Sequence, residues 1–423
     1  MKRILFIAPH SYPIKSSESI CNSKVAYTLA KAGYEVDVFT CSDPSTYPAD
    51  KDIDNLLSNS PNLQIITVKG EMLTRAMSPW KLLKGILRYT YIYLKTGYFY
   101  NGLDYSFQIV KAIKKRIAEK NGIMPYDIMI TRGFNTDYAG LYMHKKYGLK
   151  WIANWNDPYP TKRFPAPYGQ GFNAPLSHSF QKLYDEMQMN AQIHTFPSDR
   201  LRKYMLKCFT HVNAENTRVI HHMAHSDIKV NKNNIIDDCF YIVHSGWVKH
   251  PRNPRHFLEA LSNVVKQIKQ KIKCIFIGGY DSNIESIVKE FNLENIIEFK
   301  SSMTYSESLN FTAKAHLSLI IEAECEEGIY LPTKFVDAMQ SHTPVFCVSP
   351  KNGTLRDLTE KYHVGYACDN SNVKSIEKSL ILALNDYSEG KLPIISEKTA
   401  SVFFDKHILK QYEMIFEELT TTN

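Results

Sequence analysis

The chain has 423 residues, a formal net charge of +8 and a sequence pI near 8.8. Apolar residues make up 44% of it and charged residues 22%, which excludes intrinsic disorder and is typical of a globular protein with two or three domains. The basic excess suits an anionic substrate or membrane surface. No basic run with interleaved aromatic residues indicates nucleic-acid binding.

Targeting and redox signals are few. The eight cysteines form no Cys-x-x-Cys pair, so the sequence predicts neither a zinc knuckle nor a redox dithiol. The apolar part of "MKRILFIAPHSYP" is too short for a signal peptide, and no apolar stretch reaches the ~18 residues of a membrane-spanning helix. We therefore expect a cytoplasmic protein with buried free thiols.

Strands and helices are predicted to alternate through the first half of the chain. The helix expected at 17–32 ends before Gly33, which suits the left-handed conformation at a helix end. Such alternation predicts βαβ units and a parallel sheet. The expected strands are 3–8, 35–40, 63–68, 126–131, 150–155 and 193–196, and the other expected helices are 105–120, 136–147 and 176–191.

The segment 80–100, "WKLLKGILRYTYIYLKTGYFY", mixes aromatic and aliphatic residues with Lys81, Lys84, Arg88 and Lys95. Two interpretations remain open. In the first interpretation, the segment is a helix that lies in the interface of an anionic membrane, on the inner face of the cell membrane. Alternatively, it is an ordinary surface helix whose long basic side chains cover apolar surface.

The same alternation restarts in the second half, after the polar stretch 213–239. Helices are expected at 254–270, at 282–291 and from Thr333, and the segment 403–419 is an amphipathic helix with no strand after it. That last helix must pack on elements already formed. The expected strands are 240–246, 273–279, 295–299, 315–322, 344–348 and 364–368.

The segment 326–348, "EEGIYLPTKFVDAMQSHTPVFCV", lies where a parallel sheet binds ligands, beyond the carboxyl end of a strand. Pro332 suits a helix start, and helical spacing places Lys334, Asp337 and Ser341 on one polar face. Free N–H groups and Lys334 would take phosphate oxygens, while Asp337 would accept hydrogen bonds from ribose hydroxyls. A solvated helix face with an ion pair is the alternative interpretation.

The stretch "PTKFVDAMQSHTPVF" resembles the nucleotide-sugar site of GT-B glycosyltransferases, in particular the retaining family 4, in its Pro-x-Lys-x-x-(Glu/Asp) form. The family's second glutamate is here Asp337, and the position of its first glutamate is Ile329. Glu326 or Glu327 would then take the role of that first glutamate from a shifted loop. The matching residues are Pro332, Lys334, Asp337, Ala338, Pro344 and Val345.

Three further stretches resemble the same family in the same order. The opening 8–40 resembles the family's N-terminal strand and helix. The stretch 126–160 keeps Asp157 and Pro158 of a subgroup pattern. In "HSGWVKHPRNPRHFLEAL", 244–261, the resemblance implies that Gly246 lets the backbone approach the donor and that Arg252 holds the diphosphate. Lys249 and Arg255 are neighbours that would be able to share this role.

The resemblance implies an α/β protein with two Rossmann-like, doubly wound domains facing a cleft. Residues 1–215, with a crossing helix at 403–423, would bind the acceptor, and residues 216–402 would bind the nucleotide sugar. The implied activity is that of a hexosyltransferase-type enzyme, retaining and needing neither metal nor cofactor. The expected partners are a nucleotide diphosphate sugar and a glycan or lipid-linked acceptor of bacterial surface-polysaccharide synthesis.

The candidate catalytic residues are Arg252 and Lys334, which would stabilise the departing diphosphate, and Asp157, which would orient the acceptor hydroxyl or accept its proton. His10 and Arg132 are further candidates on the acceptor side, Arg132 for an acidic acceptor group. The cluster "HHMAH", 221–225, has no acidic partner at metal-ligand spacing.

Other functions stay open at this level. A nucleotide-sugar 2-epimerase would share the fold but would need cleft carboxylates and histidines for acid–base work. A non-catalytic binding protein would fit the missing first glutamate. A dinucleotide oxidoreductase is disfavoured because no Gly-x-Gly-x-x-Gly follows the first strand.

Overall fold

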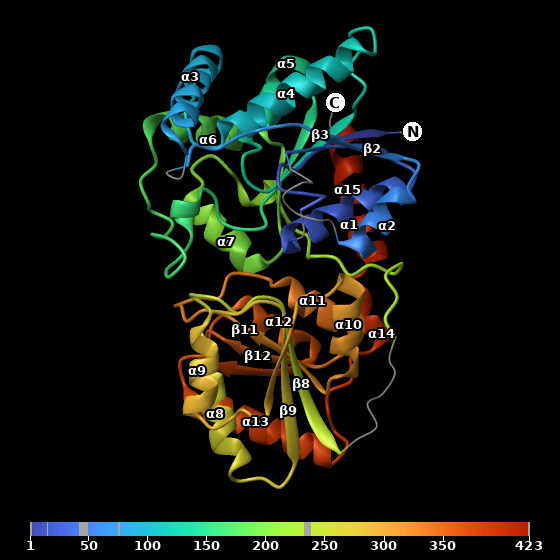
Figure 1. Cartoon of the computed structure of the whole chain (residues 1–423). Coiled ribbons are helices and arrows are strands. Elements are labelled where there is room, and N and C mark those ends of the chain that lie inside the picture. The colour runs from blue at the N-terminus through green and yellow to red at the C-terminus, as the bar shows by residue number, and fades with distance from the viewer. Residues whose placement is uncertain (1, 15, 42–49, 75–76, 232–237, 422–423) are drawn as a thin grey trace. The chain divides into compact units, whose positions relative to one another are not determined.

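The computed structural model describes residues 2–14, 16–41, 50–74, 77–231 and 238–421. The chain divides into two compact units, shown in Figure 1. Unit 1 comprises Met1–Phe164, Gly169–Ile220 and Leu409–Asn423, and unit 2 comprises Pro165–Tyr168 and His221–Ile408. The main passage from unit 1 to unit 2, at Ile220, falls within the polar stretch 213–239.

Unit 1 is built on a parallel sheet of seven strands. Apolar β-branched and aromatic residues fill most of these strands, which fits burial on both faces. The strands are β1 (Arg3–Ile7), β2 (Glu35–Thr40), β3 (Leu63–Thr67), β4 (Ile128–Arg132), β5 (Lys150–Asn154), β6 (Ile193–Phe196) and β7 (Thr217–Val219). Their order is β3-β2-β1-β4-β5-β6-β7, so the strand order reverses between β1 and β4.

The helices of unit 1 pack on this sheet or on one another. The Ser16 side chain caps the first of them by accepting a hydrogen bond from Ser19 N, 3.1 Å away. The helices are α1 (Ser17–Lys31), α2 (Lys51–Ser58), α3 (Pro79–Thr96), α4 (Leu103–Ala118), α5 (Asp137–Tyr147), α6 (His178–Asn190) and α7 (Asp199–Cys208), with short 3-10 helices at Thr161–Arg163 and Ala214–Asn216.

A buried arginine ties the last helix, α15 (Asp405–Thr421), to unit 1. Arg132, at the end of β4, donates from Nε to Asn22 Oδ1 on α1 at 2.7 Å and from Nη1 to Tyr412 Oη on α15 at 2.8 Å. Its Nη2 donates to Asn156 Oδ1 at 3.4 Å. Three segments that are distant in the sequence therefore meet at one guanidinium, and Figure 1 shows α15 running beside α1.

Unit 2 is built on a second parallel sheet, of six strands. The strands are β8 (Cys239–Ser245), β9 (Lys271–Ile277), β10 (Ile297–Lys300), β11 (Leu317–Ile321), β12 (Val345–Ser349) and β13 (Gly365–Asp369). Their order, β10-β9-β8-β11-β12-β13, reverses between β8 and β11. The two sheets confirm the prediction of two doubly wound, Rossmann-like units.

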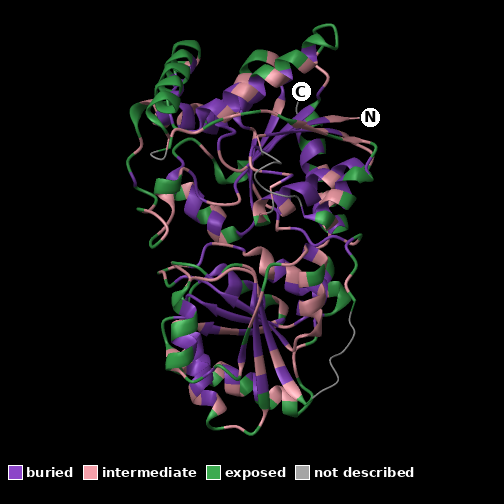
Figure 2. Cartoon of the chain, in the orientation of Figure 1, coloured by how far each residue is buried: buried purple, intermediate pink, exposed green. Residues whose placement is uncertain are grey.

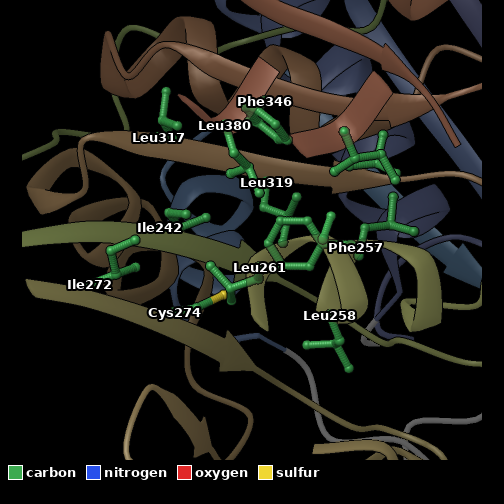
Figure 3. Packing of buried hydrophobic residues seen from close by; sticks show 14 of the residues in the cluster. Ile242, Phe257, Leu258, Leu261, Ile272, Cys274, Leu317, Leu319, Phe346 and Leu380 are labelled. Atoms are coloured by element: carbon green, nitrogen blue, oxygen red, sulfur yellow. The ribbon is translucent and has the colours of Figure 1, made fainter. Parts of the chain in front are cut away.

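Helices cover both faces of the second sheet. The helices are α8 (Arg255–Val265), α9 (Asn283–Glu290), α10 (Tyr305–Lys314), α11 (Thr333–Ser341), α12 (Thr354–Tyr362), α13 (Val373–Ser388) and α14 (Glu397–Ser401). One core joins α8, α9 and α13 to the sheet, and Figure 3 shows Phe257 and Leu261 of α8 among Ile242, Cys274 and Leu319 of the strands. The opposite face packs against α11 and α12. Buried side chains of this kind each contribute ~1.5–3 kcal/mol, so the strand ends are held rigidly.

Across the described residues, the structure contains no helix that is both long and apolar enough to cross a membrane.

The Arg132 connection predicts a specific loss of stability. Tyr412→Phe removes the acceptor of Nη1 and leaves a buried charged donor unsatisfied, which should lower the free energy of unfolding of unit 1 by about 1.5–3 kcal/mol. Denaturant unfolding followed by tryptophan fluorescence measures this loss. The matched control is Tyr34→Phe, which keeps its ring contact with Phe416 of α15 and should unfold like the wild type. Equal behaviour of the two variants would contradict the role given to Arg132.

Candidate functional site

The carboxyl edge of unit 2, where the strand order reverses, brings Gly246 and Lys334 together. Gly246 follows β8 directly and has a φ of +103°. A Cβ built on Gly246 would lie 3.1 Å from Lys334 Nζ, so the ammonium packs against a bare Cα. Any side chain at position 246 would both strain the backbone and displace the ammonium.

Lys334 lies in the first turn of α11, which begins after Pro332 and has no side-chain cap. Burial lowers the pKa of Lys334 to about 8; the positive charge of Arg252 lowers it further, and Asp337 opposes the shift. The structure therefore gathers two cations and the free N–H groups of a helix start at one place. That combination favours binding of an anion with more than one charge.

Arg252 is half-buried in the loop after β8, and its charge acts on Tyr168, Glu322 and Lys334 of unit 2. Burial raises the pKa of Tyr168, and the charge of Arg252 and its side-chain hydrogen bond with Tyr168 oppose this rise. The ring centroid of Tyr168 lies 5.4 Å from that of Tyr330. The sequence neighbour of Arg252, Arg255, has other partners: Arg255 pairs with Glu290 and lies 5.3 Å from the ring centroid of Phe291. Of these two arginines, only Arg252 acts on Lys334.

A stretch of bare backbone lies beside Gly246, and no motif in the sequence singled it out. Gly278 has a φ of +115°, and a Cβ built on it would lie 3.2 Å from the carbonyl carbon of Gly246. A Cβ on Gly279 would lie 2.3 Å from Cε2 of Trp247, whose indole is 58% exposed. The loops after β8 and β9 approach each other this closely only because these positions lack side chains. Lys249 lies on the same indole, with Nζ 5.6 Å from the ring centroid.

Glu322, which follows β11, is a buried carboxyl that sequence reasoning missed. It is 6% exposed, and its Oε2 has no hydrogen-bond partner in the part of the chain that the structure describes. Burial raises the pKa of Glu322 to about 7, and the charge of Arg252 opposes this rise. Glu326 is exposed and Glu327 is half-buried, whereas Ile329 is completely buried. Among the acids of this loop, only Glu322 combines burial with an unsatisfied oxygen.

The polar face predicted for α11 ends at Asp337. Asp337 is half-buried and accepts a hydrogen bond from Tyr305 Oη of α10. Ser341 is fully buried, and its hydroxyl contacts Ala338 O at 3.2 Å and Thr343 Oγ1 at 3.1 Å. The expectation that Ser341 continues the polar face was therefore wrong, because its hydroxyl is buried and forms its hydrogen bonds with residues at the end of α11.

Unit 1 has a small cavity at the corresponding edge of its own sheet, where the order reverses between β1 and β4. Its volume is about 10 Å³, enough for about one water-sized group. Carboxylate, amide and aromatic side chains surround it, and Asn154 Oδ1 and Asn156 Nδ2 have no hydrogen-bond partner among the described residues. The lining residues are Glu18, Gly133, Phe134, Asn154, Trp155, Asn156, Asp157 and Tyr159.

Two carboxyl groups share this cavity. Burial raises the pKa of Glu18 to about 8; the negative charge of Asp157 raises it further, and Arg132 opposes the rise. Glu18 is therefore protonated at neutral pH and offers a donor next to the carboxyl of Asp157. Gly133, with a φ of +79°, makes room for it, since a Cβ there would lie 2.1 Å from Glu18 Oε1.

Of the three residues predicted for the acceptor side, only Asp157 lines the cavity. His10 Nε2 lies 3.3 Å from Asn135 Nδ2, and burial lowers the pKa of His10. Arg132 was expected to contact an acidic acceptor group. The structure instead buries its guanidinium among Asn22, Asn156 and Tyr412, where it connects protein segments.

The histidine-rich segment 221–225 is engaged within unit 2. His221 packs against Phe403 with ring centroids 5.2 Å apart, and His225 Nδ1 accepts a hydrogen bond from Asp227 N at 3.1 Å. Among the described residues, no group of three or more His, Cys, Asp or Glu side chains is placed to hold a metal ion.

The buried carboxyl predicts a pH-dependent stability difference. The pKa of Glu322 is raised from 4.5 to about 7 in the folded protein, so between these pH values the unfolded chain releases a proton that the folded chain keeps. The wild type therefore loses stability as the pH rises through this window. Glu322→Gln has no such loss, and its advantage in free energy of unfolding should grow by up to about 3 kcal/mol between pH 4.5 and 7.

Denaturant unfolding of the ligand-free protein between pH 5 and pH 8 measures this difference. Glu326→Gln is the control, because it makes the same change on an exposed carboxyl of the same loop. A constant difference between Glu322→Gln and the wild type over this range would show that the Glu322 carboxyl is not held in a raised-pKa environment.

Comparison with known proteins identifies a family and a fold. Residues 225–398 match the family described as Glycosyl transferases group 1. A search of curated proteins gave no match. Three examples among the similar solved structures each match over nearly the whole of both chains, at an identity that shows the fold alone.

Sucrose-phosphate synthase from Thermosynechococcus elongatus has a TM-score of 0.69 and 16% identity, covering 100% of each chain. A glycosyltransferase from Rickettsia africae has a TM-score of 0.67 and 13% identity, covering 100% of this chain and 99% of its own. Anabaena Alr3699/HepE, solved in complex with UDP-glucose, has a TM-score of 0.66 and 14% identity, covering 99% and 100%. The predicted resemblance to GT-B glycosyltransferases is confirmed: residues 225–398 match the glycosyl transferases group 1 family, and the whole chain has the GT-B fold.

Proposed function

We propose that this glycosyltransferase moves a sugar from a nucleoside diphosphate donor, held by unit 2, to a hydroxyl group of a saccharide acceptor, held by unit 1. The observation that carries the proposal is the Lys334 ammonium, packed against Gly246 at the start of α11 and within the field of Arg252. A diphosphate would neutralise both cations and accept the N–H groups of the helix start.

The leaving group explains why these groups would serve catalysis as well as binding. The bond between the anomeric carbon and the diphosphate oxygen breaks, and the acceptor oxygen forms a new bond to that carbon. Negative charge grows on the diphosphate while its bond breaks, and fixed cations stabilise that charge more than they stabilise the donor. We place Arg252, Lys334 and the α11 amides in this role without a metal ion, and expect retention of the anomeric configuration.

Other groups of unit 2 fit the remaining parts of the donor. Asp337 would accept hydrogen bonds from ribose hydroxyls, with Tyr305 fixing its orientation. The bare backbone at Gly246, Gly278 and Gly279 would let the donor approach closely. We assign the contact with a sugar hydroxyl to Glu322, because its buried Oε2 lacks a hydrogen-bond partner among the described residues. Glu326 is exposed, so water satisfies its carboxylate.

The cavity of unit 1 suits the reacting hydroxyl of an acceptor. A hydroxyl both donates and accepts, and the protonated Glu18 with Asp157 offers the complementary acceptor and donor. The acceptor proton would pass to Asp157 or to the departing phosphate. We infer that the acceptor is a glycan or lipid-linked saccharide of bacterial surface-polysaccharide synthesis. The fold of Anabaena HepE, solved with UDP-glucose, supports the donor class.

Binding measurements test the donor site directly. UDP, GDP, ADP and dTDP are titrated into the wild type, and the tightest ligand is then used with the variants. Arg252→Ala and Lys334→Ala should each weaken binding by about 10–100-fold, the equivalent of one charge-assisted hydrogen bond. Arg255→Ala is the matched control, since its guanidinium pairs with Glu290 outside the site. Full affinity in both Arg252→Ala and Lys334→Ala would refute the site.

Product analysis with nucleotide sugars separates the proposed reaction from its alternatives. Slow donor hydrolysis, accelerated by an added saccharide that becomes glycosylated, is the expected result. Conversion of the donor to its 2-epimer without an acceptor would identify an epimerase of the same fold. Tight nucleotide binding without turnover of any nucleotide sugar, over a panel of saccharides, would identify a binding protein instead.

A further inference from the structure

Helix α3 of unit 1 is attached along one edge only. Of its residues, Gly85, Tyr89 and Ile92 are buried, and these lie on one face because they are three and four positions apart. Figure 2 shows the rest of the helix almost entirely exposed. Most helices of this length bury an apolar stripe and expose polar residues, and α3 departs from that rule.

The outward face of α3 is apolar. Trp80, Leu83, Leu87, Tyr91 and Leu94 recur at intervals of three and four residues and so form a continuous stripe opposite the buried edge. Their exposed fractions are 76%, 48%, 62%, 49% and 76%. Leu82, Ile86 and Tyr93 widen this surface, at 39%, 48% and 47% exposed. We call these eight residues the α3 stripe; such a patch on a water-facing surface marks an interaction site.

The basic residues of α3 lie along one flank of the stripe. Lys81, Lys84, Arg88 and Lys95 share this flank by helical spacing, and the helix contains no Asp or Glu. Arg88 also reaches back to Asp104 at 3.2 Å and Glu71 at 3.0 Å, which fixes the helix. Two copies of such a helix would repel each other, whereas an anionic surface would attract it.

The attachment of α3 keeps the stripe facing outward. Tyr89 Oη donates to Glu71 O at 2.9 Å and accepts from Gly102 N at 2.9 Å. A Cβ built on Gly85 would lie 2.5 Å from Leu73 Cδ2, so the helix backbone approaches the body of unit 1 closely at that point. The Pro79 start and the left-handed Gly97 end define the helix without help from the stripe. The apolar surface is thus not needed for folding.

We propose that α3 binds the interface of an anionic lipid bilayer, with the α3 stripe in the headgroup–acyl boundary and the basic flank against anionic headgroups. An apolar face with a neighbouring basic flank and an aromatic residue at the helix start matches this environment. The inference goes beyond the proposed function, since it concerns a surface that contacts neither the donor nor the acceptor hydroxyl. It would bring the enzyme to the place where a lipid-linked acceptor is found.

Vesicle co-sedimentation of the full chain tests the proposal. The wild type should sediment with vesicles of phosphatidylglycerol and phosphatidylcholine, and much less with phosphatidylcholine alone. Leu87→Glu/Leu94→Glu should reduce partitioning at least about tenfold, because two charges would enter the apolar boundary. The matched control, Leu382→Glu/Ile394→Glu, changes leucine and isoleucine residues of unit 2 that are 50% and 89% exposed, and should bind like the wild type.

Two further measurements separate the contribution of the basic flank from that of the α3 stripe. Lys81→Gln/Lys84→Gln/Lys95→Gln should weaken binding to the anionic vesicles and remove most of its salt dependence. The fluorescence of Trp80 should shift to the blue on vesicle addition, and Trp80→Phe should abolish that shift.

The proposal is overturned if the wild type fails to sediment with anionic vesicles, or if both double variants lose binding equally. A dimer in solution that Leu87→Glu/Leu94→Glu converts to a monomer, without vesicle binding by the wild type, would assign the α3 stripe to a second copy of the chain instead.

Discussion

The position of one ammonium group organises the candidate donor site. Lys334 rests on the bare Cα of Gly246 because β8 and β11 are neighbours in the sheet and because α11 starts immediately after Pro332. Arg252 keeps a second positive charge close enough to lower the pKa of Lys334. Two like charges held together reduce the stability of the free protein. In the proposed reaction they would also form an anion site that needs no rearrangement when charge develops on a leaving group.

Both units place their candidate site residues at the same topological feature. Each parallel sheet reverses its strand order once, and at that point the loops of two adjacent strands diverge and leave room for a ligand. In unit 2 this point carries Gly246, Arg252 and Lys334 and is basic. In unit 1 it carries Glu18 and Asp157 and is acidic. Under the proposed function, the basic site would hold the diphosphate of the donor, and the carboxyl pair would hold the acceptor hydroxyl.

The sequence predicted the sheets better than the helices. Strand starts and ends agree within about two residues in most cases, since short apolar runs between turn residues have few alternatives. The three-residue strand β7 was missed because Thr217–Val219 carries no periodic pattern. Helices α2, α7, α10, α12, α13 and α14 were also missed. All of them except α13 are short and bury few apolar side chains, so packing on the rest of the unit stabilises them. The longer α13 does carry Ile376, Leu380 and Leu384 at helical spacing, and that pattern was overlooked.

The residues of the candidate site also divide into those that the sequence could predict and those that it could not. Gly246, Arg252 and Lys334 could be selected from local motifs, and the fold brings them together. Glu322 and Glu18 could not, because what distinguishes them is burial next to groups that are distant in the sequence. The same limit explains Arg132, whose partners lie on α1, α15 and the loop after β5. Helical spacing also misplaced Ser341, since spacing gives a face but no hydrogen-bond partner.

Proton uptake on nucleotide binding tests the central claim most directly. With a pKa of about 8 in the free protein, Lys334 is half protonated at pH 8 and would become fully protonated beside a diphosphate. Calorimetric titration with the tightest nucleoside diphosphate, in two buffers of different ionisation enthalpy, should show uptake of about half a proton per ligand at pH 8. Lys334→Met should abolish this uptake. Undiminished affinity together with the same proton uptake in Lys334→Met would contradict the placement of the diphosphate at Lys334.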